Sequence, residues 1–225
     1  MPRTGFTPRQ HGFHFPNNFV NHVATLPSGK KIETNGRCGG MAYASLDYFF
    51  ADVSVPPYRA ADFPDNDGVP PDGNWLADYI YRRLMDSYCN ASAARYVLWT
   101  LRKDQPTWLG LRKGVTNCTK DEEIPRLRAA IDGGTPVVLG LIVATDIKDV
   151  GHNHQVVAYG YDFDPATGAL SVYIYDNNNP DEEVVLTTGP DNPHVKASNY
   201  PDDKPWRGFF VHHYSPVKPP VEPAP

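Results

Sequence analysis

The chain has 225 residues, a formal net charge of −5 and a composition typical of a folded protein with many loops. This length is sufficient to bury a core without disulfides or metal ions, so we expect one domain. No Lys/Arg cluster is longer than a pair, so the sequence lacks the basic stripe with which proteins follow a nucleic-acid backbone. We therefore expect no nucleic-acid partner.

Signals for membranes, export and disulfides are weak. No apolar run reaches the roughly 18 residues of a membrane span, and the first residues lack the apolar segment of a secretory signal. We expect no membrane span, and a cytoplasmic location unless export follows a non-classical route. Three cysteines leave at least one thiol free, and a pairing of Cys89 with Cys118 stays open.

The two ends of the chain differ from its middle. Residues 1–34 mix aromatic, Pro and Asn residues without a sustained period, which predicts an extended arm that lies on the domain. Residues 216–225 are rich in proline and predict a disordered, polyproline-like tail. The main domain is therefore expected to span residues 35–215.

Helical patterns fill the first half of this domain. Met41, Ala44 and Tyr48 recur at spacings of three and four residues, which predicts a helix that begins at or near Cys38. Residues 74–89 carry one wide apolar stripe and predict a second helix.

Two further helices are expected before the strands. A weaker pattern covers residues 93–101. Thr119 and Glu122 have the spacing of a capping box, and two glycines at 133–134 are a stop signal, so a fourth helix is predicted over residues 122–132.

The second half of the chain predicts β-strands. Apolar or alternating segments occupy residues 135–145, 154–164, 169–177, 182–188 and 208–214. Helices followed by strands indicate an α+β fold in which the N-terminal helices pack on a largely antiparallel β-sheet.

One predicted hairpin brings a histidine near an acid. The short turn "DPATG" at residues 164–168 joins two strands. Pairing outward from this turn places His154 opposite positions 176–178, and position 176 is an aspartate. We expect His154 and Asp176 to lie side by side at one end of the hairpin.

The alternation of side chains predicts the faces of this hairpin. His154 shares a face with Val156 and Ala158, and Asp176 shares it with Ile174, so this face is expected to pack on helices and to meet the helix that carries Cys38. The opposite face is expected to be covered by the N-terminal arm or by a partner, with the arm favoured. It carries Tyr159, Tyr161, Tyr173 and Tyr175.

These three side chains suit nucleophilic catalysis. The partial positive charge of a helix N-terminus and a neighbouring imidazolium would stabilise Cys38 as a thiolate. Asp176 would hold the ring of His154 in its productive orientation. The backbone N–H of Cys38 and one side-chain amide would stabilise an oxyanion.

The motifs "GRCGGM", "GHNHQVVAYGYD" and "VYIYDNNNP", in the order Cys, His, Asp, resemble the papain-like cysteine peptidases, and more narrowly the C39-like peptidase group. The resemblance covers residues from about Gly5 to Tyr214. It implies a papain-like fold in which Cys38 is the nucleophile, His154 the general base and acid, and Asp176 the orienting group.

The sequence departs from that family at one place. Related peptidases have a glutamine a few residues before the cysteine as an oxyanion donor, whereas this chain has "KKIETNGR" there. Asn17 and Asn35 are the candidates to replace it.

Several other interpretations compete with the peptidase. Cys38 alone is compatible with a buried structural thiol. His152, His154 and Asp176 form a possible zinc-ligand set, but no further ligand stands at a recognisable spacing, so we expect neither a metal nor a cofactor.

We predict hydrolysis of a peptide or isopeptide bond through a Cys38 thioester, with a peptide or protein as substrate. An amidase, a transglutaminase-like acyltransferase and an inactive papain-like binding module remain alternatives. The sequence leaves the oligomeric state open.

Overall fold

The computed structural model describes residues 1–25, 31–106, 113–189, 194–201 and 205–221. Within them, six antiparallel strands form one sheet in the order β7-β6-β5-β4-β3-β8. The strands are β3 (Val137–Ile142), β4 (His154–Phe163), β5 (Leu170–Tyr175), β6 (Val184–Thr188), β7 (Lys196–Ala197) and β8 (Gly208–Val211). The predicted α+β class and the antiparallel sheet are confirmed.

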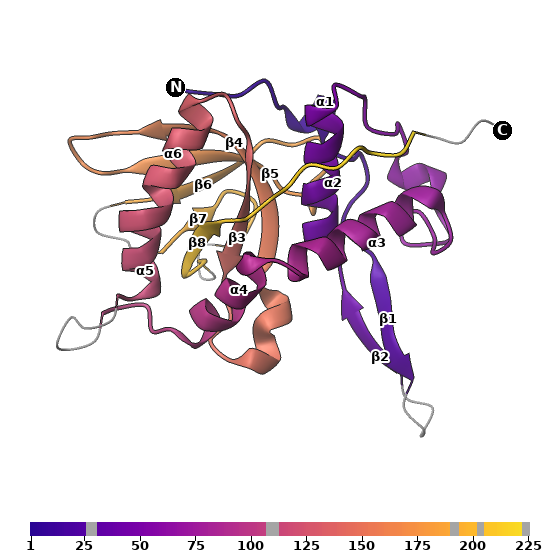
Figure 1. The fold of residues 1–225 in the computed structure, drawn as a ribbon, viewed down its shortest axis with the longest axis horizontal. Coiled ribbons are helices and arrows are strands. Elements are labelled where there is room, and N and C mark those ends of the chain that lie inside the picture. The colour runs from indigo at the N-terminus through magenta and orange to yellow at the C-terminus, as the bar shows by residue number, and fades with distance from the viewer. Residues whose placement is uncertain (26–30, 107–112, 190–193, 202–204, 222–225) are drawn as a thin grey trace.

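The helices precede most of this sheet in the chain, as expected (Figure 1). The described α-helices are α1 (Pro8–His11), α2 (Cys38–Phe50), α3 (Trp75–Tyr88), α4 (Ala91–Leu101), α5 (Val115–Cys118) and α6 (Ile124–Asp132). The start of α3 has a local cause, because the side chain of Asn74 accepts a hydrogen bond of 2.9 Å from the N–H of Leu76. Asn90 caps α4 in the same way at 2.8 Å, and α4 begins two residues earlier than the sequence predicts.

Helices cover both faces of the sheet, and this differs from the prediction. The face with Val156 and Ala158 packs on Leu127 and Ile131 of α6. The opposite face, with Val157, Tyr159 and Tyr175, packs on α2 and on Phe6 of the N-terminal arm. The helix that carries Cys38 therefore lies on the face opposite to the predicted one, and its N-terminus reaches His154 at the end of the strand.

A β-bulge changes the side on which Tyr161 lies. The β4–β5 register shifts between Ala158 and Gly160, so Tyr159 is an extra residue on its strand. Beyond the bulge Tyr161 lies in the α6 core, paired with Val172. Its predicted place on the tyrosine face is wrong, because the bulge interrupts the alternation on which the prediction depends.

The predicted capping box at Thr119 is also wrong. Thr119–Glu123 forms a π-helical turn between α5 and α6, and α6 begins at Ile124. The hydroxyl of Thr119 donates to the carbonyl of Phe209 at 3.0 Å and accepts from its N–H at 3.1 Å. Its side chain therefore binds β8 and leaves the helix start uncapped.

The N-terminal region contains more regular structure than an extended arm. The hairpin of β1 (Val20–Thr25) and β2 (Lys31–Asn35), which no sequence pattern predicts, leads into α2. The first residues do lie on the domain, since Thr4 N–H donates to the carbonyl of Tyr159 at 2.8 Å. Phe6, Phe13 and Phe15 are fully buried and anchor the arm.

The proline-rich tail is held against α2 and α3 up to residue 221, in contrast to the predicted disorder, while residues 222–225 lie outside the described part of the chain. The N–H of Val217 donates to Asp47 at 2.9 Å, and Tyr48 donates to the carbonyl of Pro220 at 2.7 Å. Buried Asp47 also pairs with Arg83 at 2.7 Å. These polar contacts around Asp47 hold the proline-rich segment in place, although it has few apolar side chains to bury.

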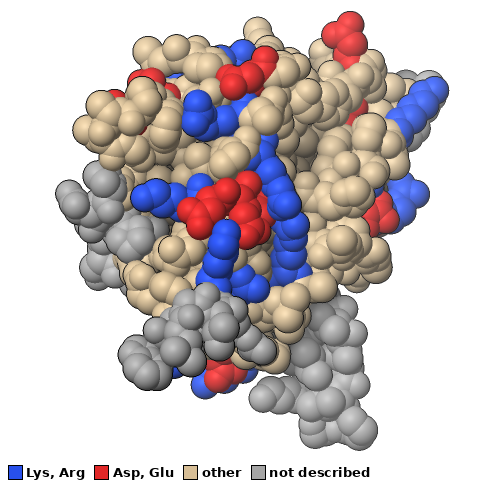
Figure 2. Space-filling model, turned by 60° about the vertical axis from the view of Figure 1, so that its left-hand side comes forward, with Lys and Arg blue, Asp and Glu red and all other residues tan. Residues whose placement is uncertain are grey.

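Charged side chains of both signs are interspersed on the face that Figure 2 shows. Within the described residues, Glu123 pairs with Arg126 at 2.7 Å and with Arg95 at 3.1 Å. None of the described helices combines the length and the apolar character needed to cross a membrane.

Asp47→Ala should lower the free energy of unfolding by about 3–5 kcal/mol, because it leaves the buried guanidinium of Arg83 without its main partner. Urea denaturation measures the change. The matched control is Asp65→Ala, which removes an exposed loop carboxylate. Equal effects of the two substitutions would contradict a central role for Asp47.

Candidate active site

Two glycines allow the start of α2 to approach its neighbours closely. A Cβ on Gly40 would collide with the carbonyl oxygen of Ile80 in α3, and one on Gly39 would collide with the amide of Gln155 in β4. The half-buried thiol of Cys38 therefore lies at a helix N-terminus packed directly against the strand that begins with His154.

The residue before the thiol is fixed by a buried arginine. The guanidinium of Arg37 donates to Asn21 Oδ1 at 2.6 Å and to the carbonyl of Ala77 at 3.0 Å. Its backbone N–H donates to Asn17 Oδ1 at 2.5 Å. These contacts from three segments determine where α2 starts.

His154 and Asp176 are in direct contact, as the hairpin predicts. Nε2 of His154 lies 2.8 Å from Oδ1 of Asp176, and both side chains are buried. Cys38 lies close enough to the same ring to contribute to its electrostatics. Since Nε2 is engaged with the carboxylate, Nδ1 is the nitrogen left for the sulfur.

Further groups hold this pair in place. The carboxylate of Asp176 also accepts the N–H of Asn178 at 3.0 Å and the Nδ2 group of Asn199 at 2.8 Å. The indole of Trp206 stacks on the ring of His154, with centroids 6.1 Å apart. Asn199 and Trp206 are not predicted as site residues, because nothing in their local sequence signals the contact.

The charges of the site reinforce one another. Burial disfavours the imidazolium, but the charge and hydrogen bond of Asp176, with Cys38, outweigh it and raise the pKa of His154 well above its usual value. Burial opposes ionisation of Asp176, but His154 and the N–H donors lower the pKa of that carboxyl. The arrangement thus favours an imidazolium beside the sulfur.

Three asparagines connect the loop after β5 to the cysteine. Nδ2 of Asn177 donates to the carbonyl of Cys38 at 3.1 Å and to that of Gln155 at 2.9 Å, which ties α2 to β4. Nδ2 of Asn17 lies 3.3 Å from Oδ1 of Asn178, so Asn17 bridges the loop before Cys38 and the loop after Asp176. The run "NNN" after the acid, part of the motif quoted above, is the sequence signal for these contacts.

A pocket of about 270 Å³ opens beside Cys38. Its walls come from the segment that leads into α2, the C-terminal end of α3, the first two turns of α4, and β4 with the segment before it. They consist of Asn35, Gly36, Cys38, Tyr88, Ala93, Tyr96, Val97, Val150, Gly151, Asn153 and Gln155. The partial desolvation of half-exposed Tyr88 on the pocket wall, together with its electrostatic interaction with Cys38, raises its pKa to about 12. Exposed Asn35 thus lines this pocket, whereas Asn17 contacts Asn178.

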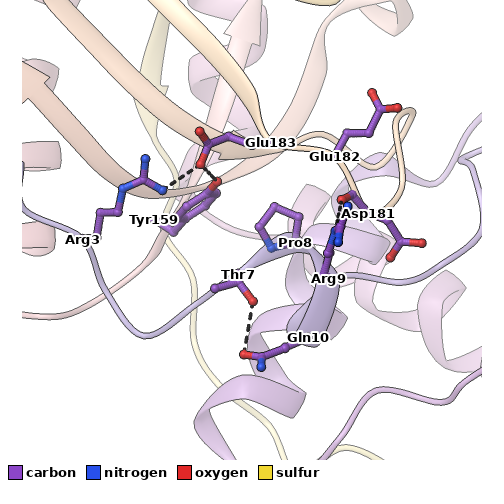
Figure 3. Close-up of a pocket in the computed structure, with 9 residues that line it drawn as sticks. All are labelled: Arg3, Thr7, Pro8, Arg9, Gln10, Tyr159, Asp181, Glu182 and Glu183. Carbon is purple, nitrogen blue, oxygen red and sulfur yellow. Dashed lines mark hydrogen bonds and ion pairs between the residues drawn. The ribbon is translucent and has the colours of Figure 1, made fainter.

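A larger groove of about 670 Å³ lies between the N-terminal arm and the loop after β5, and it contains none of the three predicted catalytic residues (Figure 3). Its polar groups bind one another. Arg3 pairs with Glu183 at 2.7 Å, and the hydroxyl of Tyr159 donates to the same carboxylate at 2.7 Å. These contacts therefore anchor the loop that follows Asp176 to the N-terminal arm and to β4.

Neither the zinc-ligand set nor the pairing of Cys89 with Cys118 is assembled in the described residues. His152 is exposed at the end of η3 (Ile147–His152), and the described residues contain no group of three or more His, Cys, Asp or Glu that could hold a metal ion. Cys89 is exposed, Cys118 is buried, and neither forms a disulfide.

Searches of protein-family models, curated proteins and solved structures find no match to this chain.

Replacing His154 by Gln should destabilise the protein most between about pH 4 and 6.5, where both partners carry charge in the folded state. Because the pKa of His154 is raised in the folded state, its charge stabilises the fold fully at pH values below the ordinary pKa of an imidazole. This stabilisation is lost as the pH rises through the pKa of His154 in the folded state. Because the pKa of Asp176 is lowered in the folded state, the stabilisation from its charge is lost as the pH falls through that lowered pKa.

Urea denaturation of wild type and His154→Gln from pH 3 to 10 measures this difference. The exposed His152→Gln is the control and should show no such maximum. A difference between wild type and His154→Gln that does not vary with pH would show that the ion pair does not form.

Proposed function

We propose that the protein is a papain-like cysteine peptidase that hydrolyses peptide or isopeptide bonds through a thioester on Cys38. The observation that carries this proposal is the convergence of a thiol at a helix N-terminus, a buried imidazole and a buried carboxylate 2.8 Å from that imidazole. A structural thiol requires neither the imidazole nor its orienting carboxylate.

The proposed reaction has two halves. The thiolate of Cys38 attacks the scissile carbonyl, and the tetrahedral intermediate collapses to a thioester as the imidazolium of His154 gives its proton to the leaving amine. His154 then takes a proton from water, the hydroxide displaces the sulfur, and the acid leaves. Asp176 stays ionised and holds the ring throughout.

Asn17 is the better candidate for the side-chain oxyanion donor. Its amide is fixed by the N–H of Arg37 at 2.5 Å, one residue before the nucleophile, and its Nδ2 group is directed toward Asn178. Asn35 is exposed and lines the neighbouring pocket without a comparable anchor. We therefore assign the side-chain donor to Asn17 and the backbone donor to the N–H of Cys38.

Iodoacetamide at pH 6 tests the proposed nucleophile. Cys38 should be alkylated at least about tenfold faster than exposed Cys89, because an ordinary thiol with a pKa near 8.5 is almost fully protonated at this pH. Peptide mass spectrometry distinguishes the sites. His154→Ala should remove the advantage, whereas the control His152→Ala should retain it. Equal labelling of both cysteines in the wild type would refute the proposal.

Asn17→Ala should slow acylation by p-nitrophenyl acetate about 10²–10³-fold, the usual cost of losing one oxyanion donor. Alkylation by iodoacetamide forms no oxyanion and should be unchanged, which separates this role from simple misfolding. Asn35→Ala is the matched control and should affect neither reaction. If Asn35→Ala slows acylation and Asn17→Ala does not, the assignment is reversed.

A further inference from the structure

The outward face of α4 is apolar. Val97, Leu98 and Leu101 are 42%, 59% and 58% exposed, and their spacing places them within about 100° around the helix axis. Ile147, 51% exposed, begins η3, which packs beside α4. We refer to these four residues as the α4 surface.

The α4 surface is unusual because α4 is apolar on its inner side as well. Tyr96 and Trp99 are buried against Phe210, so the helix has no need of apolar residues on its outer side. The charged residue of α4, Arg95, is directed to Glu123 at 3.1 Å and takes no part in this surface. Single exposed leucines are ordinary, but three exposed apolar residues on one side of a helix are a feature of binding surfaces.

This surface is continuous with the candidate active site. Val97 belongs both to the α4 surface and to the wall of the pocket beside Cys38. Tyr88, 50% exposed, lies on the same pocket wall. An apolar chain lying along α4 would therefore lead directly to the thiol.

We propose that the α4 surface binds an apolar segment of the substrate polypeptide and guides its scissile carbonyl to Cys38. This inference rests on the proposed peptidase function and narrows it to substrates with an apolar segment next to the cleaved bond. A second copy of the chain is a less suitable occupant of the α4 surface. A partner bound permanently over Val97 would block the entrance of the pocket beside Cys38, which a substrate must enter.

The test compares two peptidyl chloromethyl ketones of equal length, acetyl-Leu-Leu-Val-Ala and acetyl-Gln-Ser-Gln-Ala, as alkylating probes of Cys38. The wild type should react about tenfold faster with the apolar probe. Leu98→Glu combined with Leu101→Glu should reduce this ratio to about one. Both positions are exposed, and neither lines the pocket, so the fold and the iodoacetamide rate should be unchanged.

Val221→Glu is the matched control. Val221 is 68% exposed and follows Pro220, whose carbonyl binds Tyr48 near the C-terminal end of α2, far from Cys38 at the other end of that helix. This variant should keep the wild-type ratio.

The possible outcomes are distinguishable. If the wild type shows no fast, His154-dependent reaction with iodoacetamide, the peptidase proposal itself is refuted. With that reaction present, a wild-type ratio near one, or a ratio that survives the double substitution, would overturn only the role of the α4 surface. A wild-type dimer in sedimentation analysis that the double substitution dissociates would also overturn it, since the surface would then be a self-interface.

Discussion

The ion pair between His154 and Asp176 is the constraint on which the rest of the site depends. Removing both charges from water is costly, so the pair persists only where hydrogen bonds satisfy the remaining polar atoms. Asn199 and the N–H of Asn178 supply these bonds, and Trp206 covers the imidazole ring. The pair also fixes the ends of β4 and β5 relative to each other, and α2 is positioned against that end of the sheet.

The two ends of the chain connect the helices to the sheet. The N-terminal arm binds the loop after Asp176 through Glu183 and bridges it to α2 through Asn17. The C-terminal segment joins α2 and α3 through the buried carboxylate of Asp47. Polar interactions therefore hold the segments that carry Cys38 and Asp176 in one arrangement, which the proposed chemistry requires, since a nucleophile and its base must be in hydrogen-bonding reach.

Sequence patterns predicted the elements whose cause is local. The stripe of α3, the turn between β4 and β5, and the contact of His154 with Asp176 follow from periodicity and from the alternation of side chains. The patterns failed where a distant contact competes with a local rule. Thr119 binds β8 although its spacing is that of a helix cap, and the bulge before Gly160 moves Tyr161 to the other face.

By itself the sequence determined the α+β class, the start of a helix at Cys38 and the hairpin that pairs a histidine with an acid, because each depends on residues close in the chain or symmetric about a short turn. Only the tertiary structure decided which face of the sheet receives α2, which asparagine approaches the thiol, and that α4 exposes apolar side chains beside the pocket. These features depend on packing between segments tens to hundreds of residues apart, for which no local pattern carries a signal.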